Sequence, residues 1–92
     1  TFVESNFYTR FGEIDLIFFE KKSQTLVFVE VKYRKNDFFG SPIEMVTEEK
    51  QNKILASSQI YLLKKNWDKN VRYDIIGLNR GFDKIEWLKN AF

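Results

Sequence analysis

Two acidic residues on neighbouring predicted strands are the first candidates for chemistry in this sequence. The stretch 12–34 is rich in β-branched and aromatic residues and contains a polar segment at 21–24, a pattern typical of two strands joined by a short turn. If the turn is an even-numbered hairpin loop centred between positions 22 and 23, directly opposed residues have numbers that sum to 45. Asp15 then lies opposite Glu30, and both side chains are on the same face of the hairpin.

The same register predicts the other residues on both faces. Glu13 lies opposite Lys32, on the face that carries the two acids. The other face is wholly apolar, with Ile14, Leu16 and Phe18 against Val31, Val29 and Val27. A one-residue slip would set Asp15 against a valine of that apolar face, so the alternation favours this register.

Opposed carboxylates in a sheet have a definite electrostatic consequence. Their Cβ atoms are about 5 Å apart, and at an effective dielectric constant of about 20 the two charges repel by about 3 kcal/mol, or about two pKa units. We therefore expect either one carboxyl group to hold a proton near neutral pH or a cation to lie between them. A hard divalent cation with oxygen ligands is the natural occupant, and Lys32 beside it could hold or polarise a water molecule.

The alternative is a solvated face without chemistry. In that case Glu13 and Lys32 form a cross-strand ion pair that contributes well under ~1 kcal/mol. Like charges directly opposite each other are a poor choice for such a face. Glu30 and Lys32 also interrupt a run with valines at alternate positions, which argues for a role other than solvation.

The remaining segments predict the elements that hold the hairpin in a sheet. We expect a strand over 1–9, a loop over 35–41, a short turn over 42–45, a helix from about 48 to 65, a strand over 71–78 and a strand over 83–88. The strand at 71–78 follows a helical crossover, so we expect it to be parallel to its neighbour. Residues 1–92 therefore predict a single α/β domain with one long helix and a mixed sheet, in the order β-β-β-α-β-β.

The predicted helix presents one stripe of residues to the sheet. Thr47, followed by Glu48 and Glu49, is a helix start signal. Residues at three- and four-residue steps form the stripe: Ile54, Leu55, Ser58, Tyr61 and Leu62. Gln51 extends this stripe by one turn, so it could reach the carboxylates or their water; the alternative is a partly exposed glutamine. Lys50 is a candidate for a phosphate-binding rim, or else belongs to a solvated face.

Three further residues have two interpretations each. Arg10, between the first two strands, could contact phosphate or be a surface arginine beside a turn. Asp74, inside the strand at 71–78, could assist the site, but a structural hydrogen-bond acceptor is the interpretation that we favour. Trp87 is most simply a core residue.

Composition excludes several classes of protein. With 92 residues and a net charge of +2, the chain is a small domain whose affinity for nucleic acid would come from a local patch. It has neither cysteine nor histidine, which excludes disulfides, thiolate metal sites and Ser-His-Asp hydrolysis and fits a reducing cytoplasm. No stretch approaches the ~20 apolar residues of a membrane span, so we expect no membrane association.

The acidic motif resembles a known signature. Asp15, followed on the next strand by Glu30-Val31-Lys32, is similar to the active-site signature of the PD-(D/E)XK nuclease superfamily. The runs 9–17 and 27–34 resemble the bacterial YraN-like, endonuclease-like family. Further matches to this family are at 40–42, at 46–47 with 50–51, and at 85–92, so the resemblance covers nearly the whole chain.

The resemblance implies a restriction-endonuclease-like core that cleaves phosphodiester bonds in nucleic acid, with DNA as the expected partner. Asp15, Glu30 and the Val31 carbonyl would bind Mg²⁺ or Mn²⁺, and Lys32 would activate water. Accessory roles would belong to Glu13 as an auxiliary acid, to Gln51 in aligning water or substrate, and to Arg10, Arg34 and Lys50 in contacting phosphate.

Other expectations accompany this resemblance. Members of the family carry a helix before the first strand, so we expect this chain to be truncated at its N-terminus. Two other functions remain open, a nucleic-acid-binding module that does not cut and a structural or dimerisation domain. A homodimer is compatible with each of them, because exposed sheet edges and the many phenylalanines favour self-association.

Overall fold

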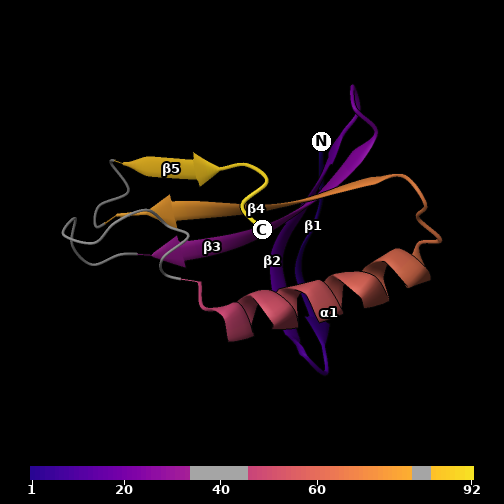
Figure 1. The fold of residues 1–92 in the computed structure, drawn as a ribbon. Helices are drawn as coiled ribbons and strands as arrows, with labels where there is room; N and C mark the ends of the chain where they lie inside the picture. The colour runs from indigo at the N-terminus through magenta and orange to yellow at the C-terminus, as the bar shows by residue number, and fades with distance from the viewer. Residues whose placement is uncertain (34–45, 80–83) are drawn as a thin grey trace.

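A five-stranded mixed sheet with one helix packed on one face makes up the part of the chain that the computed structural model describes, residues 1–33, 46–79 and 84–92 (Figure 1). The elements are β1 (Phe2–Thr9), β2 (Gly12–Glu20), β3 (Thr25–Tyr33), α1 (Glu48–Lys64), β4 (Asn70–Leu78) and β5 (Ile85–Leu88). The sheet order is β1-β2-β3-β4-β5, and only the β3–β4 pair in it is parallel. The predicted meander, helical crossover and mixed sheet are confirmed.

The β2–β3 hairpin has the predicted register. Leu16 pairs with Val29, and the ladder continues in the same register to Glu20 and Thr25, next to the turn. Gln24 adopts a φ of 54° and closes this turn by donating its N–H to the Lys21 carbonyl. No pairs of this ladder are formed beyond Leu16 and Val29 in the described residues, so Asp15 and Glu30 lie just past its end.

The alternation of β2 breaks at Asp15. Its counterpart on β1 is Asn6, which has a φ of 54° and is skipped by the β1–β2 pairing. Ile14 and Ile17 would lie on opposite faces of a regular strand, yet both are buried in the cluster that contains Tyr61 of α1. The prediction that Ile14 faces the opposite side is therefore wrong, because an irregularity in the two strands turns it toward the helix.

Helix α1 begins with the predicted cap. The Thr47 hydroxyl accepts a hydrogen bond from the Lys50 N–H at 3.1 Å. The fully buried positions of the helix are Ile54, Ser57, Ser58 and Tyr61, whereas Leu55 and Leu62 are half-buried. Ser57, absent from the predicted stripe, hydrogen-bonds to Thr9 of β1 at 2.8 Å.

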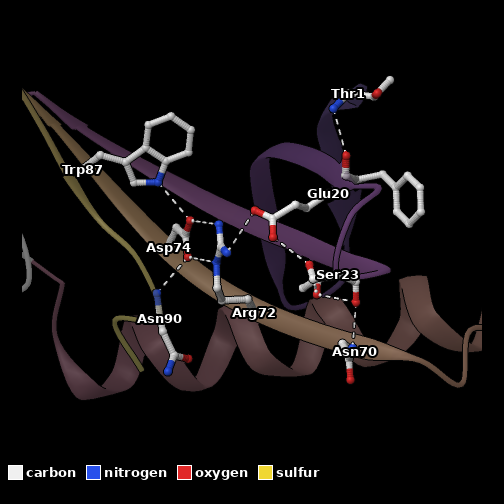
Figure 2. Close-up of polar contacts among 10 residues, drawn as sticks. Thr1, Glu20, Ser23, Asn70, Arg72, Asp74, Trp87 and Asn90 are labelled. Carbon is white, nitrogen blue, oxygen red and sulfur yellow. Dashed lines mark hydrogen bonds and ion pairs between the residues drawn. The ribbon is translucent and has the colours of Figure 1, made fainter.

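A polar cluster lies on the sheet face opposite the helix. Tyr73 points to α1, because its hydroxyl hydrogen-bonds to Ser58, so the side chains of Arg72 and Asp74 lie on the other face. Asp74 is fully buried and accepts hydrogen bonds from Arg72 through both carboxylate oxygens, from the Trp87 indole and from the Asn90 N–H, each at 2.9 Å (Figure 2). The structural role predicted for Asp74 is confirmed.

Other expectations have mixed outcomes. Trp87 is 47% exposed, so the prediction that it is a core residue is wrong. Its indole N–H instead hydrogen-bonds to Asp74 on the sheet face opposite the helix. Arg34 and the predicted loop and turn over 35–45 lie outside the described residues. Within the described ranges no helix is long and apolar enough to cross a membrane.

Candidate carboxylate and metal site

The candidate site lies where the β2–β3 ladder ends. Glu30 is only 6% exposed, and it is on the face covered by α1, because Lys50 of that helix reaches it. The Asp15 side chain lies beside it and accepts the Val31 N–H through Oδ2 at 2.8 Å. The Asp15 side chain thereby links β2 to β3 at a position where their backbones no longer pair. The two acidic side chains therefore lie next to each other, as the hairpin register predicted.

Burial and the neighbouring Asp15 disfavour the ionised form of Glu30. The pKa of Glu30 is raised to about 8, chiefly by burial and then by a hydrogen bond with Asp15 and the negative charge of Asp15. The positive charges of Lys50 and Lys32 oppose this change without cancelling it. Glu30 is therefore mainly neutral at pH 7, which agrees with the expectation that one of two opposed carboxyl groups holds a proton.

One carboxyl oxygen of Glu30 lacks a hydrogen bond within the described residues. Oε2 is buried and has no hydrogen-bond partner within the described part of the chain, although Lys50 Nζ lies 3.5 Å away as an ion-pair partner. A buried polar atom without a hydrogen bond costs about 1–3 kcal/mol, so its presence calls for an explanation such as a ligand.

A divalent cation fits this donor set. The described residues contain no group of three acidic, histidine or cysteine side chains that could hold a metal, so Asp15 and Glu30 are a two-carboxylate set. Mg²⁺ suits such a set, because it keeps several of its waters and commonly takes only one or two carboxylates from the protein. The Val31 carbonyl, between the acid and Lys32 in sequence, is a further oxygen donor of the same segment.

Glu13 lies apart from this pair. It pairs with Tyr8 of β1, and a hydrogen bond with the Glu13 carboxylate is the largest cause that raises the pKa of the exposed Tyr8 hydroxyl. Among the ion pairs of the described residues, none joins Glu13 to Lys32. The ion pair that the solvated-face alternative requires is therefore not formed in the described residues, because backbone pairing of β2 with β3 has ended at Leu16, before it would reach Glu13.

The start of α1 brings Lys50 to the site. The Gln51 side-chain N–H donates a hydrogen bond to the Val46 carbonyl at 3.1 Å, which links Val46 to the first turn of α1. Its predicted role in aligning water stays a prediction. Lys50 was expected to contact phosphate, and its ion pair with Glu30 was not foreseen. A signal was present, because Lys50 precedes the buried Ile54 by four residues and so shares its helix face.

Arg10 is exposed in the turn between β1 and β2. Its guanidinium carbon lies 4.9 Å from the ring centroid of Phe11, a cation–π contact within the turn. This geometry leaves both interpretations of Arg10 open.

Fold and site together define a small mixed α/β protein in which a buried Glu30 lies beside a half-buried Asp15, with lysines on both sides. The sequence model of the family described as "Uncharacterised protein family UPF0102" matches residues 1–78. The chain is 45% identical over 92 residues to a UPF0102 protein of Vibrio parahaemolyticus, covering 98% of this chain and 74% of that protein. It is 42% identical over 92 residues to one of Legionella pneumophila (98% and 76%) and 41% identical over 87 residues to one of Psychromonas ingrahamii (95% and 70%). The chain belongs to the UPF0102 family, the YraN-like group that its motifs resemble.

Proposed function

We propose that this protein is a metal-dependent nuclease that hydrolyses phosphodiester bonds in nucleic acid, with DNA as substrate. The observation that carries the proposal is the buried Glu30, which lies beside Asp15 and within the field of Lys32 and Lys50, and whose Oε2 has no hydrogen-bond partner among the described residues. Buried acids with strongly shifted pKa values and specific charged neighbours are concentrated at functional sites. The element order β-β-β-α-β-β, which a restriction-endonuclease-like core would require, supports the same proposal.

The residues of the site would divide the work. Asp15, Glu30 and the Val31 carbonyl would hold Mg²⁺ or Mn²⁺, and a bound ion of this kind supplies Lewis-acid stabilisation and lowers the pKa of water. Glu30 would hold the ion in its ionised form, so the proton favoured by its raised pKa would pass to solvent. Lys32 would orient the attacking water and stabilise the negative charge that develops on the phosphoryl oxygens. Arg10 and Arg34 are candidates for contacts with flanking phosphates, which position the substrate.

A nucleic-acid-binding module on the same fold is the rival function. It is favoured by the small acidic set, since the described residues offer two carboxylates at the site rather than three. The rival predicts DNA affinity that falls with salt but no cleavage when metal is added.

Calorimetric titration of Mn²⁺ and Mg²⁺ separates these functions. We expect binding to the wild type and none to Asp15→Ala/Glu30→Ala, followed by metal-dependent cutting of branched, duplex or single-stranded substrates. Lys32→Ala should abolish cutting while DNA affinity stays within a few-fold, because this lysine is assigned to chemistry. Absence of metal binding even with DNA present would refute the nuclease and leave the binding module.

A further inference from the structure

Lys50 occupies an unusual position for a lysine. It lies in the first turn of α1, where the Thr47 hydroxyl accepts its N–H at 3.1 Å. The positive end of the helix dipole disfavours a cation there, and Glu48 and Glu49 in the same turn fit the usual preference. An acidic partner offsets this unfavourable position of the Lys50 ammonium, and Glu30 of β3 is that partner.

The partner atom is the one that a metal would need. Lys50 Nζ lies 3.5 Å from Oε2 of Glu30, the oxygen without a hydrogen-bond donor in the described residues. The Lys50 ammonium therefore places a positive charge at the oxygen where a metal would bind. A divalent cation on Oε2 would meet this ammonium at close range and repel it.

The Lys50 side chain is partly exposed and can move away from Glu30 toward solvent. Its side chain is 36% exposed, whereas the Glu30 side chain is 6% exposed, so the lysine reaches from solvent into the site. An ammonium on a flexible four-carbon stem can leave one anion for another without a change of backbone.

We propose that Lys50 is an exchangeable counter-ion: it neutralises the Asp15–Glu30 pair in the absence of metal, is displaced from Glu30 by a divalent cation, and then contacts a phosphate of the nucleic acid. This inference rests on the proposed function, since it assumes both the metal and the nucleic acid. It adds a coupling between them, because arrival of the metal frees a cation for the substrate. Binding of each partner then strengthens binding of the other.

The chain offers a matched control. Lys53 lies three residues further along α1 and pairs with Glu49 at 3.5 Å on the helix surface. Lys53→Gln removes the same charge from the same helix without changing a contact of Glu30. Lys50→Arg keeps the charge at the site and tests whether an effect of Lys50→Gln is one of charge.

The first measurement is the affinity for Mn²⁺ by calorimetry without nucleic acid. Lys50→Gln should bind Mn²⁺ at least about fivefold more tightly than the wild type, because no ammonium has to be displaced. Lys53→Gln and Lys50→Arg should stay within about twofold of the wild type. Equal or weaker Mn²⁺ binding by Lys50→Gln would overturn the inference. If no protein in the series binds Mn²⁺, the proposed function fails and the inference fails with it.

The second measurement is the affinity for duplex DNA with and without Mn²⁺, in a Lys32→Ala background that keeps the DNA uncut. Mn²⁺ should tighten DNA binding, and the tightening should be at least about threefold smaller when Lys50→Gln is added. An unchanged tightening would show that the freed ammonium does not reach the phosphate. Lys53→Gln in the same background should retain the full effect.

Discussion

Glu30 is held in a fold that disfavours its charged form. The carboxyl group is buried, it lies beside Asp15, and the opposing charges of Lys32 and Lys50 compensate only in part. Because the pKa of Glu30 is raised, the free energy of unfolding depends on pH and on any ligand that favours the ionised carboxylate.

The stability of the metal-free protein should fall as pH rises. The pKa of Glu30 is raised to about 8 in the folded protein from an ordinary value of 4.5, so between these values the folded state holds more protons than the unfolded state. The free energy of unfolding therefore decreases over this range, by about 1.4 kcal/mol for each step of one in pH. Glu30→Gln should lack this component.

Urea denaturation in EDTA, from about pH 5 to about pH 9, checks this expectation. The quantity of interest is the difference between the wild type and Glu30→Gln, because other titrating groups are common to both proteins. We expect the variant to gain relative stability steadily up to about pH 8. A difference that does not change with pH would contradict the raised pKa.

Asp15→Asn should stabilise the metal-free protein. The substitution removes the negative charge beside Glu30, while an amide oxygen can still accept the Val31 N–H. We expect a gain of about 1–2 kcal/mol near pH 8, where the wild-type pair is forced toward two charges. Thermal unfolding in EDTA measures it, and a melting temperature several degrees lower would show that Asp15 contributes chiefly through its contacts.

At the scale of elements, the sequence predicted those features that local patterns determine. The β2–β3 register followed from alternation and an even turn, and the start of α1 followed from Thr47 with the two glutamates after it. The inward turn of Ile14 was not predictable in this way, because it depends on the irregularity at Asn6 of a different strand. Tertiary contacts decide such features, and no periodicity within one segment reports them.

The site residues follow the same division. The encounter of Asp15 with Glu30 needed only the hairpin register. The ion pair of Lys50 with Glu30 needed the position of α1 over the sheet, which sequence spacing does not give. Trp87 was assigned to the core from its hydrophobicity alone, whereas a hydrogen bond to Asp74 determines where its indole lies.

Asp74 connects β4 to β5 and to the residues that follow it. It accepts hydrogen bonds from Arg72, Trp87 and the Asn90 N–H (Figure 2). Next to this contact the Ala91 N–H donates to the Tyr73 carbonyl at 2.7 Å. The same carboxylate, through its hydrogen bond, is the main reason that the pKa of Arg72 is raised. One buried side chain therefore adds to the backbone pairing of β4 with β5 in attaching the end of the described chain to the sheet.

Asp74→Ala should destabilise the protein by about 3–5 kcal/mol, because it leaves the largely buried Arg72 guanidinium with only its 3.4 Å contact to Glu20 and two further donors without their acceptor. Trp87→Phe removes one of these hydrogen bonds and should cost about 1 kcal/mol. Denaturant midpoints compare the two variants. Equal losses would show that the hydrogen bonds of Asp74 with Arg72 and Asn90 contribute little beyond the one with the Trp87 indole. Mn²⁺ affinity of Trp87→Phe should match the wild type, since this cluster lies on the other face of the sheet.

At the scale of the whole molecule, charge is distributed unevenly over a nearly neutral chain. The net charge is only +2, so the long-range field that attracts nucleic acid to strongly basic proteins is weak here. Lysines at the end of β3 and at the start of α1 flank the carboxylate pair, whereas Lys64 lies at the opposite end of the helix, near the Phe7 ring. Affinity for nucleic acid should therefore depend on which cations are removed rather than on how many.

Salt titration of DNA binding in EDTA tests this local patch. With about two phosphate contacts, from Arg10 and Arg34, while Lys50 stays paired with Glu30 in the absence of metal, the logarithm of the binding constant for duplex DNA should fall against the logarithm of salt concentration with a slope of about −2. Arg10→Gln should reduce the magnitude of this slope by about 0.9, because one fewer phosphate is neutralised. Lys64→Gln removes an identical charge far from the site and should leave the slope unchanged. If both substitutions change it equally, the binding follows net charge, and the phosphate contacts assigned to the site are wrong.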